Sequence, residues 1–339
     1  MTRSEGEANV HVSDPVLDIR GLHVVYRSAG AEVAALADFN LRLGQGDTVG
    51  LVGESGCGKS TVALAILGLL GPAGKIVAGS IRFHGQELVS AAPRRLRSIR
   101  GRRIAMIFQE PMAALNPVFT IGTQISEAIR LHRGAARRQT RDLTLQIMAD
   151  VQIPEPHRIA RAYPHQLSGG LRQRAMIAIV LVGQSDLLIV DEPTTALDVT
   201  IQAQILDVLV QLQADRAMSL ILISHDLRLV AETTGRIAVM YGGMVVEEQP
   251  TPLLMAAPVH PYSRALLRSL PRLDQPQAAS LPRLDQAGWS ARPVTSGCPY
   301  QLHCDMVQPR CRTAGITEQH IVSGGIVRCV HPEINKGAR

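Results

Sequence analysis

A glycine-rich loop between an apolar strand and a helix constrains the fold of this chain most strongly. The loop fills every position of the pattern G-x-x-x-x-G-K-[ST] and consists of Gly53, Glu54, Ser55, Gly56, Cys57, Gly58, Lys59 and Ser60. Residues 47–52 before it resemble a buried strand, and residues 60–70 after it resemble a helix. Glycines let the backbone curl so that its amides face phosphate, and a helix N-terminus favours anions. The pattern therefore predicts an α/β domain that binds ATP at this loop.

Three side chains at the start of the following helix are candidate ligands. We expect Lys59 to reach the β- and γ-phosphates, and Ser60 to offer its hydroxyl to Mg²⁺. Thr61 is a candidate donor to the α-phosphate region because of its position alone. The alternative is a glycine-rich turn that serves packing only, and the lysine and serine at the required positions argue against it.

Two adjacent carboxylates follow a second apolar run, residues 187–190. Asp191 is thereby placed at the carboxyl edge of a parallel sheet, where α/β proteins bind ligands. We expect Asp191 to hold Mg²⁺ through water. Glu192 points elsewhere and is the candidate general base for a water that attacks the γ-phosphate. In the alternative interpretation the two acids only solvate a strand end.

A second element that can face phosphate, Ser168-Gly169-Gly170, opens a helix that extends to about residue 182. The N-terminus of such a helix attracts anions. Together with the phosphate loop and the acidic pair, this element resembles the ABC-type ATPases, and the resemblance covers nearly all of residues 16–335. In that family the element faces the γ-phosphate held by the opposite subunit, so that a head-to-tail dimer buries two ATP molecules. The resemblance therefore implies a partner ATPase, identical or related.

The same resemblance assigns roles to four single residues. It makes Gln109 a contact to Mg²⁺ or the attacking water, and it makes Asp198 a contact to the partner subunit. His225 follows an apolar strand, where its imidazole would hydrogen-bond the γ-phosphate, although a lone histidine there is more often without function. Tyr26 matches the aromatic residue that stacks on adenine, although a tyrosine at a strand end is often plain core.

The family resemblance also implies a fold. We expect a P-loop ABC-type ATPase core in residues 16–268, with an antiparallel β subdomain and a helical subdomain over about residues 121–160. Residues 108–122 contain two prolines and form a candidate hinge between the subdomains. Their pattern P-M-x-x-L-N-P followed by T-I-G resembles importers of dipeptides, oligopeptides and nickel, as does His260-Pro261-Tyr262.

The chain changes character beyond the ATPase core. Residues 269–275 recur unchanged as residues 280–286, both reading SLPRLDQ, and their prolines and short period indicate a linker over residues 269–296. Residues 297–335 form an expected C-terminal metal-binding region of the oligopeptide-transporter type. This region holds four of the five cysteines, namely Cys298, Cys304, Cys311 and Cys329.

A reducing cytosol disfavours disulfides, so we expect these four thiols to bind a metal that stabilises the small tail. Four thiolates suit either Zn²⁺ or a 4Fe-4S cluster, but the spacing lacks the C-x-x-C pairs typical of zinc. The family resemblance favours the iron–sulfur cluster. Zinc and free thiols remain the alternatives.

Composition bears on partners and location. The net charge of +6 and six arginines between residues 94 and 103 suggest nucleic acid, but aromatic residues make up only 3% of the chain and base-stacking platforms are scarce. A solvated face near anionic lipid heads fits this charge better. No stretch resembles a membrane span, and residues 1–7 lack the apolar core of a signal peptide. We expect a peripheral protein at the cytoplasmic face of the inner (plasma) membrane.

The sequence thus predicts the ATP-hydrolysing subunit of an ABC importer for peptides or a related solute such as nickel. The implied partners are a second ATPase subunit, two transmembrane permeases and an extracytoplasmic substrate-binding protein, and no nucleic acid is expected. The cargo stays open among dipeptide, oligopeptide, nickel and glutathione, because other subunits choose it. The main rival is a soluble ABC ATPase acting on nucleic acid or ribosomes, which usually carries two ATPase units or long coiled-coil inserts. A redox-sensing regulator built on the tail cysteines is a third, remote alternative.

Overall fold

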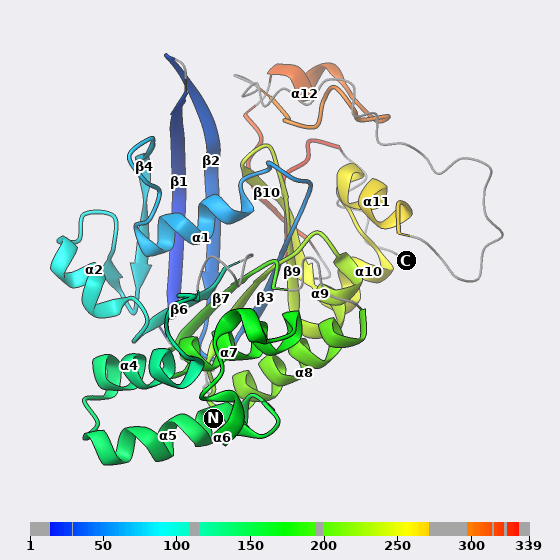
Figure 1. Ribbon diagram of the computed structural model, residues 1–339. Coiled ribbons are helices and arrows are strands. Elements are labelled where there is room, and N and C mark those ends of the chain that lie inside the picture. The colour runs from blue at the N-terminus through cyan, green and yellow to red at the C-terminus, as the bar shows by residue number, and fades with distance from the viewer. Residues whose placement is uncertain are drawn as a thin grey trace, which may run out of the picture.

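Two β-sheets with helices around them build the part of the chain that the structure describes (Figure 1). The computed structural model describes residues 14–28, 30–108, 115–193, 199–270, 297–313, 315–321 and 324–331. The smaller sheet is antiparallel with the order β2-β1-β4-β5. Its strands are β1 (Leu17–Ser28), β2 (Ala31–Leu43), β4 (Gly74–Phe83) and β5 (Gln86–Glu87).

The larger sheet has the order β11-β12-β10-β9-β3-β8-β7-β6. Its strands are β3 (Thr48–Val52), β6 (Ile104–Ile107), β7 (Leu187–Asp191), β8 (Ser219–Ile223), β9 (Arg236–Tyr241), β10 (Met244–Pro250), β11 (Gln319–His320) and β12 (Ile326–Val327). The run from β9 to β6 is parallel, and β10, β12 and β11 continue it antiparallel. The central strands are buried along their whole length, as expected for parallel strands covered on both faces.

The helices fall into three groups (Figure 1). Helix α1 (Lys59–Leu67) packs between the two sheets, and its buried side chains share one apolar cluster with both. The helical subdomain contains α4 (Ile121–Arg133), α5 (Arg137–Asp150), α6 (Pro156–Ile159) and the start of α7 (Gly169–Leu181). The remaining helices are α2 (Pro93–Ile99), α8 (Val199–Asp215), α9 (Leu227–Thr233), α10 (Thr251–Ala256), α11 (Pro261–Arg268) and α12 (Pro309–Thr313).

This architecture confirms the predicted fold class. The strand expected over residues 47–52 is β3, the helix expected over residues 60–70 is α1, and the antiparallel and helical subdomains are both present. The predicted linker over residues 269–296 lies outside the described residues except for its first two, so the domain boundaries remain predictions.

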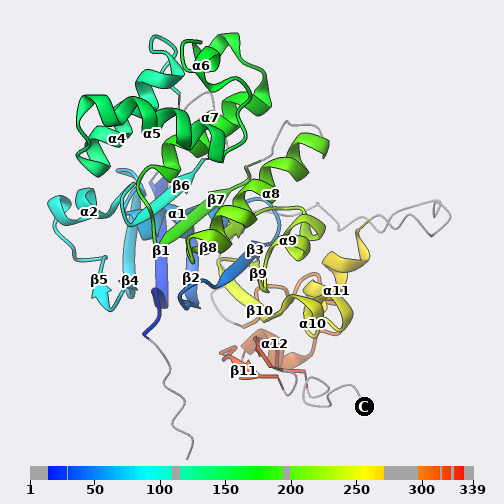
Figure 2. The ribbon, with the colours of Figure 1, turned by 90° about the horizontal axis from the view of Figure 1, so that it is seen from below.

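The C-terminal tail is integrated into the larger sheet. Strand β12 pairs with β10, so that Val327 lies opposite Glu247 and Ile326 opposite Glu248. The buried guanidinium of Arg328 lies 2.7 Å from an Asp38 carboxylate oxygen on β2. Figure 2 shows α12 and β11 at the end of the molecule opposite α4 and α6. The sequence patterns did not indicate this pairing, because a two-residue strand carries no readable periodicity.

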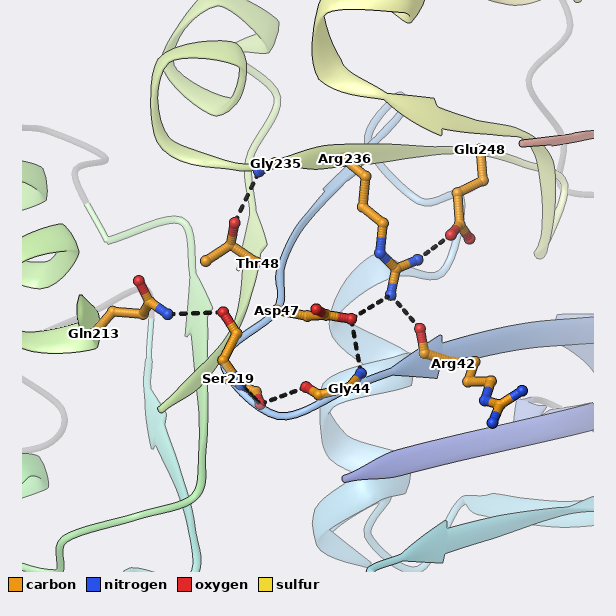
Figure 3. A network of polar contacts seen from close by, with 10 residues as sticks. Arg42, Gly44, Asp47, Thr48, Gln213, Ser219, Gly235, Arg236 and Glu248 are labelled. Carbon is orange, nitrogen blue, oxygen red and sulfur yellow. Dashed lines mark hydrogen bonds and ion pairs between the residues drawn. The ribbon is translucent and has the colours of Figure 1, made fainter. Parts of the chain in front are cut away.

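Polar contacts fix the amino-terminal end of β3, the strand that carries the glycine-rich loop (Figure 3). The Ser219 hydroxyl donates to the Gly44 carbonyl at 2.8 Å, which joins β8 to the turn before β3. The Gly235 amide donates to the Thr48 hydroxyl at 2.8 Å, which joins the start of β9 to β3. Arg236 donates to a carboxylate on β10 and to a backbone carbonyl of β2. These bonds hold β3 in register between its neighbours.

We predict that Gly50→Ala in β3 destabilises the fold. A Cβ at Gly50 would lie 1.9 Å from Val230 Cγ1 and 3.0 Å from the Thr234 hydroxyl, so helix α9 would have to move off the sheet. Overpacking of this kind costs about 1–3 kcal/mol, measured as the free energy of unfolding in urea. The control is Gly315→Ala, because a Cβ there meets nothing within 4 Å. Equal stability of both variants would contradict the close packing of β3 against α9.

Candidate functional site

The glycine-rich loop joins β3 to α1 at the carboxyl edge of the larger sheet. Gly53 has φ 153° and Gly58 has φ 106°, a backbone region that residues with a Cβ rarely adopt. A Cβ at Gly53 would lie 2.3 Å from the Met240 carbonyl oxygen, and one at Gly58 would lie 2.5 Å from the Ala35 carbonyl oxygen. Both glycines are therefore required by the backbone conformation and by the close approach of neighbouring strands.

Lys59 lies over this loop with only 6% of its surface exposed. Its ammonium group donates to the carbonyl oxygens of Gly53 at 2.7 Å and Glu54 at 2.9 Å. The lysine thus places a positive charge beside the loop amides, as an anion site requires. Cys57 is buried inside the loop, and burial raises the pKa of its thiol, which keeps it protonated and weakly reactive.

Ser60 and Asp191 come together from α1 and β7. The serine hydroxyl hydrogen-bonds the buried Asp191 carboxylate. Burial raises the pKa of this carboxyl group, while the Ser60 bond and the Lys59 charge lower it. A hydroxyl and a carboxylate side by side are oxygen donors of the kind that Mg²⁺ takes beside a nucleotide. Thr61 is partly exposed on the first turn of the same helix.

Glu192 and His225 form a second pair at the same sheet edge. The Glu192 amide donates to the Ile223 carbonyl at 3.0 Å, and its carboxylate lies 3.3 Å from His225 Nδ1. Glu192 has φ 45°, a left-handed conformation that is strained for a residue with a Cβ. Strain of this kind tends to persist where the surrounding structure holds a functional side chain in place. The imidazole is mostly exposed, so the pair faces outward from the sheet.

Ser168 caps the N-terminus of α7, because its hydroxyl accepts the Leu171 amide at 3.4 Å. Ser168 and Gly169 are exposed, whereas Gly170 is buried. This helix start belongs to the helical subdomain, while the glycine-rich loop belongs to the core. Because Ser168 and Gly169 are exposed, the start of α7 is accessible to another molecule.

The other predicted site residues are less well placed. Tyr26 on β1 lies opposite Val33, is half-buried and packs against the cluster around α1. Its proposed stacking on adenine therefore remains a prediction. Gln109 and Asp198 lie outside the described residues.

The tail brings its four cysteines together. They line one pocket with His260 and Tyr300, and they are Cys298, Cys304, Cys311 and Cys329. Burial raises the pKa of the Cys298 thiol to about 12, so metal binding there would have to displace a proton. Among the described residues, no three histidine, cysteine, aspartate or glutamate side chains are close enough to hold a single metal ion.

Two contacts to the glycine-rich loop were not predicted from the sequence. The Tyr262 hydroxyl accepts the Glu54 amide at 3.1 Å, and the Gly243 amide donates to the Cys57 carbonyl at 3.2 Å. In the sequence, the motif that contains Tyr262 indicates only a family resemblance. Contacts between segments so far apart in the sequence leave no local pattern.

Two family models match this chain. The ABC transporter model matches residues 36–195, and the model named Oligopeptide/dipeptide transporter, C-terminal region, matches residues 246–311. A Brucella ovis protein provisionally named a peptide import ATP-binding protein is 44% identical and covers 88% of this chain and 92% of its own length. A dipeptide transport ATP-binding protein of Haemophilus influenzae is 43% identical, and the alignment covers 88% of this chain and 93% of that protein.

Solved structures share the core. A dimeric ATP-binding cassette in a post-hydrolysis state, bound to ADP and Pi, aligns with a TM-score of 0.62 at 26% identity and covers 69% of this chain and 98% of its own. A second solved structure is cbiO1 from Clostridium perfringens, part of the ABC transporter complex cbiONQ. It aligns with a TM-score of 0.62 at 25% identity, and the alignment covers 72% of this chain and 92% of cbiO1.

We predict that Glu192→Gln retains ATP binding but loses turnover. The amide keeps the size of the side chain and cannot take a proton from water, so ATP hydrolysis should fall by about 10²- to 10⁴-fold. Phosphate release and nucleotide binding by the purified chain measure the two effects. Glu32→Gln on β2 is the control, because it removes only an exposed ion pair with Arg27. Rapid turnover by Glu192→Gln would remove Glu192 as the base.

Proposed function

Because this chain belongs to the ABC transporter family, and within it to the ATP-binding proteins with an oligopeptide/dipeptide transporter C-terminal region, we propose that it powers the import of peptides. The chain is an ATPase. The observation that carries peptide import is the presence of both matched regions in one chain, together with relatives named for peptide and dipeptide transport over most of its length. Nickel and glutathione are the cargoes that an experiment must separate from peptides.

The site supports the following division of roles. Lys59 neutralises the β- and γ-phosphates, and the loop amides bind their oxygens. Ser60 and Asp191 hold Mg²⁺, which neutralises phosphate charge when bound. Glu192 takes a proton from the water that attacks the γ-phosphorus, and the bond to the bridging oxygen of ADP breaks. His225, paired with Glu192, donates a hydrogen bond to a γ-phosphate oxygen.

A second ATPase subunit completes each site in this proposal. The exposed Ser168 and Gly169, with Gly170 behind them, contact the γ-phosphate bound to the partner subunit. Asp198 contacts the partner, and Gln109 contacts Mg²⁺ or the attacking water. The partner is identical or related.

Two permeases dock beside the predicted hinge, and an extracytoplasmic binding protein delivers the peptide. Support comes from three exposed apolar side chains within residues 108–122, the predicted hinge, namely Phe108, Val118 and Phe119. No helix among the described residues has the length and apolarity needed to span a membrane. In this proposal the permeases hold the chain at the cytoplasmic face of the membrane.

Mass spectrometry of partners tests this assembly. We expect tagged Glu192→Gln, loaded with ATP, to recover two permeases and a second ATPase from gently solubilised native membranes, because ATP that is not hydrolysed keeps the dimer closed. The peptide or other ligand of the associated binding protein then identifies the cargo. Recovery of only soluble or ribosomal partners would overturn the import function and leave the ATPase activity in place.

A 4Fe-4S cluster in the tail pocket is the second part of the proposal. Four thiols that converge on one pocket supply the donor set of such a cluster, whose four irons each take one thiolate. A single Zn²⁺, which also takes four thiolates, is the alternative metal. Cys298, Cys304, Cys311 and Cys329 would hold the cluster, whose role is structural or regulatory.

We predict that Cys304→Ser lowers the iron and acid-labile sulfide content of anaerobically purified protein while nucleotide binding is retained. One of four ligands is lost, so the cluster is destabilised, whereas the lining of the tail pocket includes no residue of the glycine-rich loop. Elemental analysis and visible absorbance measure the change. Cys57→Ser is the control because this thiol lies outside the pocket. If the unmodified chain contains zinc and no acid-labile sulfide, the metal is zinc and the iron–sulfur assignment is wrong. If neither the unmodified chain nor the Cys57→Ser control contains a metal, the four cysteines are free thiols.

A further inference from the structure

The glycine-rich loop is held by a residue that lies outside every nucleotide-binding motif. Tyr262, on the first turn of α11, is fully buried, and its hydroxyl accepts the Glu54 amide at 3.1 Å. The Glu54 carbonyl accepts a hydrogen bond from Lys59 at 2.9 Å. Both backbone groups of Glu54 are thus bound, one by the lysine of the loop and the other by α11. These two bonds fix the orientation of the first peptide units of the loop.

A buried carboxylate holds the start of α11 in place. Glu247 on β10 is inaccessible to solvent and accepts the amides of Val259 and His260, both at 2.8 Å. His260 Nδ1 in turn accepts the Tyr262 amide at 3.1 Å and caps the helix. Burial lowers the pKa of His260 to about 3, so the ring is neutral and Nδ1 is available as an acceptor. Hydrogen bonds to a carboxylate are stronger than neutral ones, and they set Tyr262 on a rigid support.

Besides Glu247, the C-terminal tail also supports Tyr262, through contact with its ring. Three tyrosine rings pack together, with centroids 4.7 Å apart for Tyr241 and Tyr262, 5.1 Å for Tyr241 and Tyr300, and 5.3 Å for Tyr262 and Tyr300. Tyr300 is buried and lies in the tail between Cys298 and Cys304. The wall of the cysteine pocket thus packs directly against the ring that holds the loop.

A backbone contact joins the same two regions independently. The turn between β9 and β10 packs against the tail so closely that a Cβ at Gly242 would lie 2.8 Å from Pro299 Cβ. The next residue, Gly243, donates its amide to the Cys57 carbonyl at 3.2 Å. The tail therefore supports the loop near both Glu54 and Cys57.

We propose that Tyr262 is a positioning residue of the nucleotide site and that the cysteine-bearing tail holds it in place through Tyr300. The packing of Tyr300 against Tyr262 then contributes to the affinity of the loop for nucleotide. This inference rests on the ATPase activity, and it depends neither on the cargo nor on a metal in the pocket. Failure of the importer assembly would leave it intact.

Tyr262→Phe in the full-length chain tests the hydroxyl contact. The ring and its packing remain, while the Glu54 amide loses its acceptor. We expect the Kd for ADP and the KM for ATP to rise about 2- to 10-fold, the range for one lost hydrogen bond, with kcat changing less than KM. Calorimetry and steady-state phosphate release measure these values. A lowered melting temperature with unchanged Kd would assign Tyr262 to packing alone and overturn the proposal.

Ser263→Ala is the matched control. It removes a hydroxyl from the neighbouring residue of α11, which is equally buried and has no hydrogen-bond partner among the described residues. Its nucleotide affinity should equal that of the unmodified chain. An equal loss in Ser263→Ala and Tyr262→Phe would show that any change in α11 acts on the site, and it would refute a specific role for the Tyr262 hydroxyl.

A double-mutant cycle tests the link to the tail. Tyr300→Ala opens space beside the Tyr262 ring, so we expect it to weaken ADP binding in the unmodified chain. In the Tyr262→Phe background, Tyr300→Ala should weaken ADP binding less. The hydrogen bond between the Tyr262 hydroxyl and the Glu54 amide, through which Tyr300 would act, is already missing there. Additive losses, or no loss from Tyr300→Ala, would separate the tail from Tyr262 and overturn that half of the proposal.

Discussion

The placement of β3 between β8 and β9 is the constraint on which the nucleotide site depends. Strand β3 ends where the glycine-rich loop begins, so an error in its register would displace every amide that faces phosphate. Hydrogen bonds from Ser219 and Gly235 fix its beginning, and the absence of a side chain at Gly50 lets α9 pack directly on it. The loop is held in turn by Lys59 from within and by Tyr262 from outside. These bonds fix the backbone of the loop, which reduces the ordering that nucleotide binding must impose.

Each charged group buried near the site has partners that compensate for its loss of hydration. Lys59 donates to two loop carbonyls, and Asp191 accepts from Ser60. Glu247 accepts two backbone amides and the Gln249 side-chain amide, so three donors compensate for its burial. A buried carboxylate without such partners would be costly. The polar interior therefore specifies one arrangement of α11 relative to β10, and with it the position of the tyrosine on that helix.

Much of the fold and part of the site could be predicted from the sequence because their signals are local. The glycines and lysine of the phosphate loop, the carboxylates after β7 and the cap of α7 each lie within a few residues of the element that explains them. The contacts of Tyr262, Tyr300 and Arg328 could not be predicted, since each depends on pairing between distant segments. The four tail cysteines could be predicted only in part. Their number in the sequence indicates a cluster, but the packing of their pocket against the core follows only from the three-dimensional structure. Gln109 and Asp198 lie outside the described residues.

The pairing of β12 with β10 has a consequence for biosynthesis. Asp38 and Arg328 are 290 positions apart, so the contact that fastens the tail to β2 has one of the longest sequence separations possible in this chain. Until translation has passed residue 328, β10 presents its backbone amides and carbonyls as an open sheet edge, to which a strand of another chain can add. Contacts of such separation form late, because the loop that they close is entropically costly. A nascent chain of this protein therefore carries an exposed edge during the last part of its synthesis, from the completion of β10 until β12 has been made, and the final strands remove that hazard.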